Sequence, residues 1–212
     1  MYAYAANNPV RYIDPDGRSP NLARLKVLAK EVHDKGTINR INLYRKCSSD
    51  GCFARATILA GELNKEGFDI KYIIVDNPDT IDKKGKFNYH ISVQITIDGT
   101  DYVIDPYYSH DLKKQPGLTT RNEWIFGQGC KTAKNESAVD DEGNIIPSSK
   151  FSFLYSQRAN KKLSCSEFAQ DWLKNFSKVY KSDEEVEKMN SEELRTYINS
   201  YRDYTGTSDE NN

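Results

Sequence analysis

Apolar residues repeat with a helical period in four segments of the chain. In each segment they recur every three or four residues, which is the spacing of one face of an α-helix. The second segment opens at Cys52 and ends near Lys65, just before Gly67, a residue suited to a helix C-terminus. The predicted helices cover residues 20–33, 52–65, 164–180 and 191–201.

The middle of the chain has the pattern of β-structure. Residues 70–75 predict a short strand. Two longer segments, 89–97 and 100–105, flank Asp98-Gly99, which is the strongest short signal for a β-hairpin. The sequence therefore predicts a small antiparallel sheet.

Two segments are predicted as loops. Residues 77–87 are polar and interrupted by proline and glycine, and residues 107–149 are loop-like with Trp124-Ile125-Phe126 as their main apolar anchor. Helices packed around a small antiparallel sheet make an α+β fold.

The hairpin fixes the relation between two polar residues. If Asp98-Gly99 forms a two-residue turn, Asp105 lies opposite Ser92. Asp105 is then one diagonal step from His90, about 7–8 Å away at Cα and on the same face of the sheet. The opposite face is almost purely apolar, which fixes the register. We expect a hydrogen bond between the Asp105 carboxylate and the His90 imidazole, although a polar strand face without chemistry is the alternative.

Composition narrows the possible functions. The net charge is −1, which argues against a nuclease that neutralises phosphates and against nucleic acid as a partner. The chain has no apolar run of about 18 residues and no signal-peptide core, so neither membrane insertion nor a signal peptide is expected. No metal or cofactor is predicted, because the three histidines are scattered and no CxxC pair occurs. A single disulfide between two of the four cysteines remains possible, and the sequence does not choose its partners: Cys47, Cys52, Cys130 and Cys165.

Cys52 is the candidate nucleophile. It follows Ser48-Ser49-Asp50-Gly51, a run of capping and turn residues, and so falls in the first turn of the predicted helix. A helix N-terminus stabilises negative charge and therefore favours a thiolate there. A cysteine that only fills the apolar stripe is the alternative. With His90 as base and Asp105 to orient it, Cys52 would form a triad for nucleophilic catalysis.

The three motifs around these residues resemble the bacterial protein-glutaminase group of the papain/transglutaminase-like superfamily. The matching segments are Cys52-Phe53-Ala54-Arg55-Ala56, Tyr89-His90-Ile91-Ser92-Val93 and Val103-Ile104-Asp105-Pro106. Ser92 replaces a common alanine, and Tyr107 replaces a common serine. The resemblance covers about residues 45–110, and nothing after them supports it.

The resemblance implies both fold and reaction. The catalytic cysteine would start a helix packed on a small antiparallel sheet that carries the histidine and the aspartate. Cys52 would attack the side-chain amide of a protein glutamine, His90 would protonate the departing ammonia, and water would release glutamate. A cysteine protease or a transglutaminase-type acyltransferase would use the same triad and stays open. A non-enzymatic binding domain and a nuclease are weaker alternatives.

Residues 1–18 resemble the end of the RHS-repeat core, where a conserved shell meets a variable toxin domain. Pro9 is followed after four residues by Asp14-Pro15-Asp16-Gly17, and Arg18 replaces the usual leucine. This similarity implies that residues 19–212 are the toxin domain of a larger polymorphic toxin, with a catalytic core at about 45–110 and a helical part at about 160–203. The implied partners are the RHS shell, a target-cell protein substrate and a cognate immunity protein. The implied setting is interbacterial competition by a secreted or injected effector that acts in the target-cell cytoplasm.

Overall fold

The computed structural model describes residues 20–44, 51–76, 89–106, 117–159 and 162–205. The predicted RHS junction at 1–18, the predicted loop at 77–87 and Cys47 lie outside these residues. The architecture below therefore concerns the proposed toxin domain.

A five-stranded antiparallel sheet forms the centre of the molecule, with the strand order β6-β5-β4-β3-β7. A separate pair of two-residue strands, β1 and β2, follows the first helix. The mixed α/β fold with an antiparallel sheet confirms the predicted class. The strands are β1 (Thr37–Ile38), β2 (Ile41–Asn42), β3 (Ile70–Asp76), β4 (Tyr89–Ile97), β5 (Thr100–Ile104), β6 (Leu118–Thr120) and β7 (Lys134–Ser137).

The β4–β5 hairpin has the predicted register. Ile97 pairs with Thr100, and the ladder continues to Val93 opposite Ile104. Asp98 and Gly99 both have positive φ, at 50° and 74°. Asp-Gly suits a two-residue turn that needs this conformation at both positions.

The predicted helices all form, and further helices accompany them. The helix at 52–65 has the predicted bounds, and the others agree within a few residues. Two begin at capping residues, Asn21 before the first helix and Ser164 in a capping box with Glu167. The helices are α1 (Leu22–Lys35), α2 (Cys52–Lys65), α3 (Arg121–Gly127), α4 (Ser149–Arg158), α5 (Cys165–Val179), α6 (Asp183–Glu187) and α7 (Ser191–Thr205).

The prediction of a loop over 107–149 is wrong at three places in its described part. The segment contains β6, α3 and β7, which have three, seven and four residues. Elements this short complete too few periods to give an apolar pattern. A capping box between Thr120 and Glu123 starts α3 and was the available local signal.

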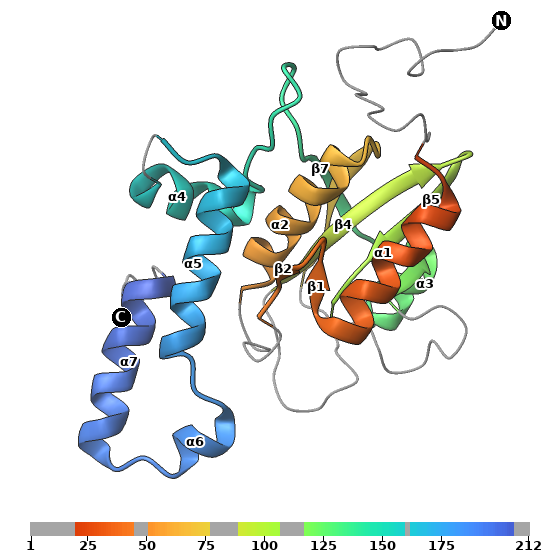
Figure 1. Ribbon diagram of the computed structural model, residues 1–212. Coiled ribbons are helices and arrows are strands. Elements are labelled where there is room, and N and C mark those ends of the chain that lie inside the picture. The colour runs from red at the N-terminus through yellow and green to blue at the C-terminus, as the bar shows by residue number, and fades with distance from the viewer. Residues whose placement is uncertain (1–19, 45–50, 77–88, 107–116, 160–161, 206–212) are drawn as a thin grey trace, which may run out of the picture.

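The two faces of the sheet carry two separate cores. Ile91, Val93 and Ile95 of β4 belong to the large core that also includes residues of α1, α2 and α5. On the other face, α3 covers a smaller core formed by Ile73, Val75, Val103, Trp124 and Ile125. Figure 1 shows α1 and α2 in front of the sheet and α3 behind it, while α6 and α7 extend from the end of α5.

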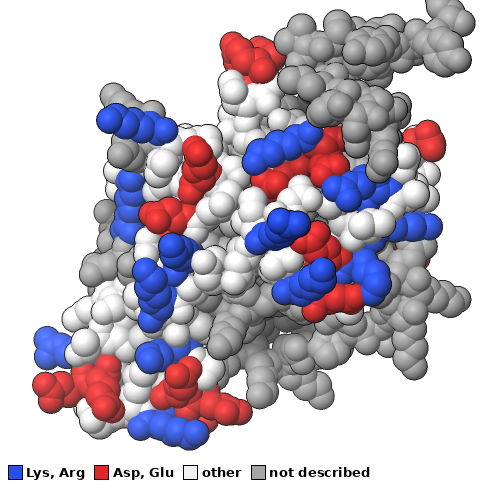
Figure 2. All heavy atoms as spheres, in the orientation of Figure 1, with Lys and Arg blue, Asp and Glu red and all other residues white. Residues whose placement is uncertain are grey.

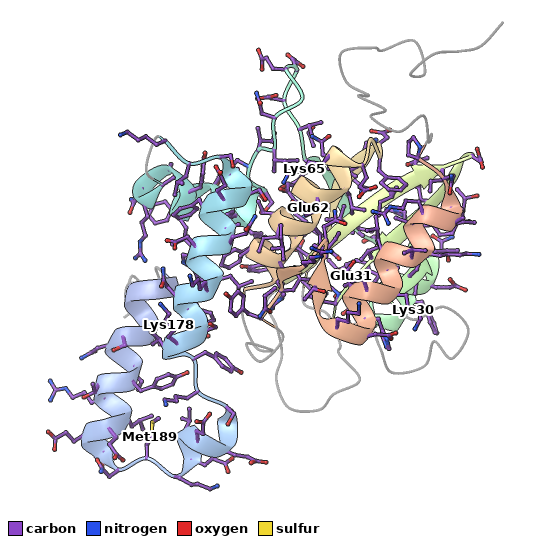
Figure 3. All side chains as sticks on the ribbon, viewed as in Figure 1. Lys30, Glu31, Glu62, Lys65, Lys178 and Met189 are labelled. Carbon is purple, nitrogen blue, oxygen red and sulfur yellow. The ribbon has the colours of Figure 1, made fainter. Side chains whose placement is uncertain are left out.

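Charged residues on the outer surface are mixed in sign. Figure 2 shows Lys and Arg interspersed with Asp and Glu over α1 and α2. Part of this mixture is a network in which Lys65 pairs with Glu62 at 2.6 Å, and Arg24 pairs with Glu66 at 2.5 Å. Figure 3 shows Glu62 and Lys65 together on α2. Within the described part of the chain, no helix is both long and apolar enough to cross a membrane.

The close contact between α2 and α5 depends on Gly61. A Cβ at this position would lie 2.5 Å from Ser166 Oγ and 2.9 Å from Ser166 Cβ. Alanine normally stabilises a helix by about 1 kcal/mol relative to glycine. Here we expect Gly61→Ala to lower the free energy of unfolding by about 1 kcal/mol or more, because overpacking outweighs propensity.

Urea denaturation of a double-mutant cycle tests this expectation. In a Ser166→Gly background both clashing atoms are absent, so Gly61→Ala should become neutral or stabilising. An equal loss of stability in both backgrounds would contradict the packing argument.

Candidate active site

Cys52 is the first residue of α2 and is partly exposed. The preceding residue, Gly51, is the N-cap and has a φ of 81°, a left-handed conformation that favours glycine. A Cβ on Gly51 would also lie 3.0 Å from Leu173 Cδ1 of α5. The side-chain capping expected from residues 48–50 falls outside the described residues. The chain thus places Cys52 at a helix N-terminus, the end of a helix that favours negative charge.

His90 and Asp105 form the predicted hydrogen bond. His90 Nε2 lies 2.6 Å from Asp105 Oδ2. The side chains of His90 and Asp105 are 13% and 1% exposed, so water screens the pair weakly. Ser92, which lies opposite Asp105 in the predicted register, donates a hydrogen bond from Oγ to the Ile104 carbonyl. This bond ties β4 to the end of β5, just before Asp105.

Cys52 also acts on this imidazole, because its side chain, like the Asp105 carboxylate, raises the pKa of His90. Burial by itself would lower the pKa of His90, but the Asp105 carboxylate and the Cys52 side chain together raise it to about 10. With a pKa of about 10, His90 is an imidazolium at neutral pH, so the ring carries a positive charge beside Asp105 and Cys52. The structure therefore brings together all three residues that the sequence singled out.

Trp124 is a further residue of the site that the sequence analysis assigned only to packing. Its indole Nε1–H donates to Asp105 Oδ2 at 2.8 Å, so one carboxylate oxygen takes part in bonds to both Trp124 and His90. The Trp124 and His90 rings stack with centroids 5.7 Å apart. Trp124 is fully buried in α3. It fixes the carboxylate and forms one wall against the imidazole.

The remaining cysteines have a different character. Cys130 and Cys165 are free thiols, so neither forms the disulfide that the sequence left open. Burial raises the pKa of the Cys165 thiol to about 12, which keeps it protonated and unreactive at neutral pH. Among the residues that the structure describes, no group of three or more His, Cys, Asp and Glu side chains is arranged to hold a metal ion.

Comparison with known proteins gives one distant structural likeness to report. No family model and no curated protein matches the chain. A solved structure described as "Crystal Structure of Protein-glutaminase" superimposes with a TM-score of 0.40 and 18% identity. The match covers 63% of this chain and 88% of that one. At this level of similarity it assigns neither a family nor an activity to the chain.

We predict that Trp124→Phe lowers the free energy of unfolding by more than the smaller ring alone would cause. The substitution keeps an aromatic ring but removes one donor from a buried carboxylate, which costs about 1–3 kcal/mol. The matched control is Trp124→Phe in an Asp105→Ala background, where the acceptor of the indole N–H is absent. Urea denaturation measures both variants. Equal losses for the two would show that the bond to Asp105 contributes nothing measurable.

We also predict a pH-dependent contribution of Asp105 to stability. The pKa of His90 in the folded state is raised to about 10 from an ordinary value of 6.5. A histidine with a raised folded-state pKa contributes stability that is complete below its unfolded pKa and disappears as the pH rises through the folded one.

The difference in unfolding free energy between wild type and Asp105→Asn should therefore be largest near pH 6 and shrink towards about pH 10. Denaturant titrations across this range measure it. A difference that does not change with pH is incompatible with an imidazolium–carboxylate pair.

Proposed function

We propose that this chain is a cysteine-dependent amidohydrolase that deamidates glutamine side chains of target-cell proteins. Cys52 would be the nucleophile, His90 the acid and base, and Asp105 the orienting group, in a papain/transglutaminase-like arrangement. The observation that carries the proposal is an imidazole that is hydrogen-bonded to a buried carboxylate and whose pKa is also raised by a cysteine at a helix start. A nucleophile, a base and an orienting group gathered at one site are what thiol catalysis needs.

Acylation follows from the protonation states of the pair. The Cys52 thiolate attacks the side-chain amide carbon of glutamine, and the carbonyl oxygen takes the negative charge. A backbone N–H in the first turn of α2, which we assign to Cys52 itself, stabilises that oxyanion. The His90 imidazolium gives its proton to the amide nitrogen. The C–N bond then breaks, which releases ammonia and leaves a thioester on Cys52.

Deacylation reverses the roles of the same groups. Neutral His90 takes a proton from a water molecule, and the resulting hydroxide attacks the thioester carbon. The C–S bond breaks, the thiolate is restored, and glutamate is released in place of glutamine. The His90 imidazolium is regenerated, held in orientation by Asp105. The substrate gains one negative charge at that side chain.

The biological setting is also part of the proposal. The segment from Pro9 to Gly17, with its resemblance to the end of an RHS-repeat core, supports residues 19–212 as cargo of a larger effector. A producing cell would then need an immunity protein, because the domain could also deamidate glutamines in the proteins of the producing cell. The effector would act in the cytoplasm of the target cell.

The test is ammonia release from a blocked glutamine dipeptide, together with mass spectrometry of exposed target-cell protein. We expect Cys52→Ala to lower kcat/KM by at least about 10³-fold, because no other group replaces the nucleophile. Cys165→Ala is the matched control and should retain activity, because Cys165 is buried away from the imidazole in the large core. Glutamine-to-glutamate conversion adds about one dalton per site.

Other outcomes would reassign the chemistry. Cleaved chains would make the protein a protease, and crosslinked chains would make it an acyltransferase. Ammonia release that survives Cys52→Ala would contradict the catalytic role of the thiol.

A further inference from the structure

A group of lysines lies at the same end of the sheet as the candidate active site. We call it the basic patch and define it as Lys131, Lys134 and Lys150 around Asp76. Asp76 ends β3 and pairs with Tyr89, the residue before His90. Lys134 starts β7, also at this end of the sheet, and pairs with Ile74. The strand order thus places Asp76 one strand and Lys134 two strands away from the strand that carries His90.

Asp76 and Lys134 of the patch are on the same side of the sheet as Cys52. Ile74 of β3 and Tyr89 both contact the large core into which α2 packs, and Cys52 contacts that core as well. Because side chains alternate along a strand, Asp76 projects on the same side as Ile74. The basic patch therefore flanks the nucleophile on the β7 side.

Helix α4 brings Lys150 to this position. The next residue, Phe151, stacks on Phe53 with ring centroids 5.0 Å apart, and Phe53 directly follows Cys52. Lys150 Nζ lies 4.8 Å from the centroid of the Tyr89 ring. Both partners of the cation–π contact are therefore connected to the candidate site. Tyr89 directly precedes His90 in the sequence, and Lys150 precedes Phe151, which stacks on the neighbour of Cys52.

Charge in the patch is only partly compensated. Asp76 Oδ2 lies 2.7 Å from Lys134 Nζ, and Asp76 Oδ1 lies 3.8 Å from Lys150 Nζ. One carboxylate thus serves two ammonium groups, and the second contact is at the limit of an ion pair. Glu136, the other nearby acid, is directed to the start of α4, where it accepts hydrogen bonds from Ser149 N and Oγ. Among the described residues, the three lysines of the patch outnumber the two nearby acids, Asp76 and Glu136, the second of which also acts on the charge of Lys134.

A cavity of about 240 Å³ opens beside these residues. Its lining includes Asp76, Lys131 and Lys134, together with Cys130. The Lys134 side chain is 76% exposed and that of Lys150 is 36% exposed, so both can meet a partner without rearrangement of the core. Positive charge beside a recess favours an acidic side chain of a polypeptide.

We propose that the basic patch is a substrate subsite that selects glutamines with an acidic residue nearby in the substrate protein. The proposal rests on the proposed function for its place beside the scissile amide, but not for the binding itself. An acidic side chain on the substrate pairs with Lys134 and Lys150. This contact positions the neighbouring glutamine over Cys52.

Deamidation of matched peptides tests the preference. The peptides differ only in whether the residues beside glutamine are Glu, Ala or Lys. For wild type we expect kcat/KM to follow the order Glu, Ala, Lys, with about three- to tenfold between the extremes, as for exposed ion pairs. The double variant Lys134→Glu/Lys150→Glu should reverse the order.

Lys71→Glu is the matched control for the single variants Lys134→Glu and Lys150→Glu, because each changes the net charge by −2. Lys71 is exposed near the opposite end of β3, so it changes the overall charge without touching the patch. This variant should keep the wild-type order of peptides. If Lys71→Glu changed the peptide preference as much as the patch variants do, the preference would come from long-range attraction alone, and the subsite would be overturned.

Peptide binding to the inactive Cys52→Ala variant of this chain separates the subsite from the reaction. Fluorescence polarisation with a labelled Glu-flanked peptide should show tighter binding than with the Lys-flanked one, and the difference should shrink at high salt. If no glutamine peptide is deamidated but this difference persists and depends on the patch lysines, the proposed reaction fails and the subsite stands. No difference between the peptides overturns the subsite, whatever the activity.

Discussion

The candidate site depends on the buried carboxylate of Asp105. An ionised carboxylate removed from water is costly unless it is paired and hydrogen-bonded. Here a single oxygen, Oδ2, meets both the His90 ring and the Trp124 indole, at 2.6 and 2.8 Å. The two groups belong to different elements: His90 lies on strand β4, and Trp124 lies on the short helix α3 that covers this face of the sheet. The helix α3 is therefore as much a part of the site as the hairpin, although it contributes no triad residue.

The sequence predicted what short-range rules control. The Asp98-Gly99 turn set the register of the hairpin, and this register carried His90 and Asp105 to one face. The helix that begins at Cys52 could also be predicted, because its apolar residues keep the helical spacing up to Lys65. Both features depend on neighbours within about ten residues, where period and turn chemistry are informative.

The residues that the sequence did not assign are those whose partners lie in another element. Trp124 bonds Asp105, 19 positions earlier, and nothing in the run Trp124-Ile125-Phe126 distinguishes a tryptophan that packs from one that donates. The edge strands β6 and β7 have three and four residues and take their conformation from the strands they pair with. Tertiary contacts override weak local preference in such elements. The N-cap of α2 also depends on another element, because Leu173 of α5 leaves little room for a side chain at Gly51.

The triad joins two faces of the sheet, and this explains why the site lies at the end of the strands. His90 belongs to the face that α3 covers, where it stacks on Trp124, whereas Cys52 belongs to the face that α2 covers. A side chain from one face meets a side chain from the other only where the sheet ends. Both helices also have to be fixed closely, because the thiol reaches the imidazole across that end. Close packing of α2 against α5 at Gly61 and of α3 against the sheet through Trp124 supplies this constraint. In the proposed reaction, a substrate amide between thiol and imidazole would lie over the end of the sheet, with its flanking residues along the ends of β3 and β7. The side chains at those strand ends, rather than on either face, would then decide what the site accepts.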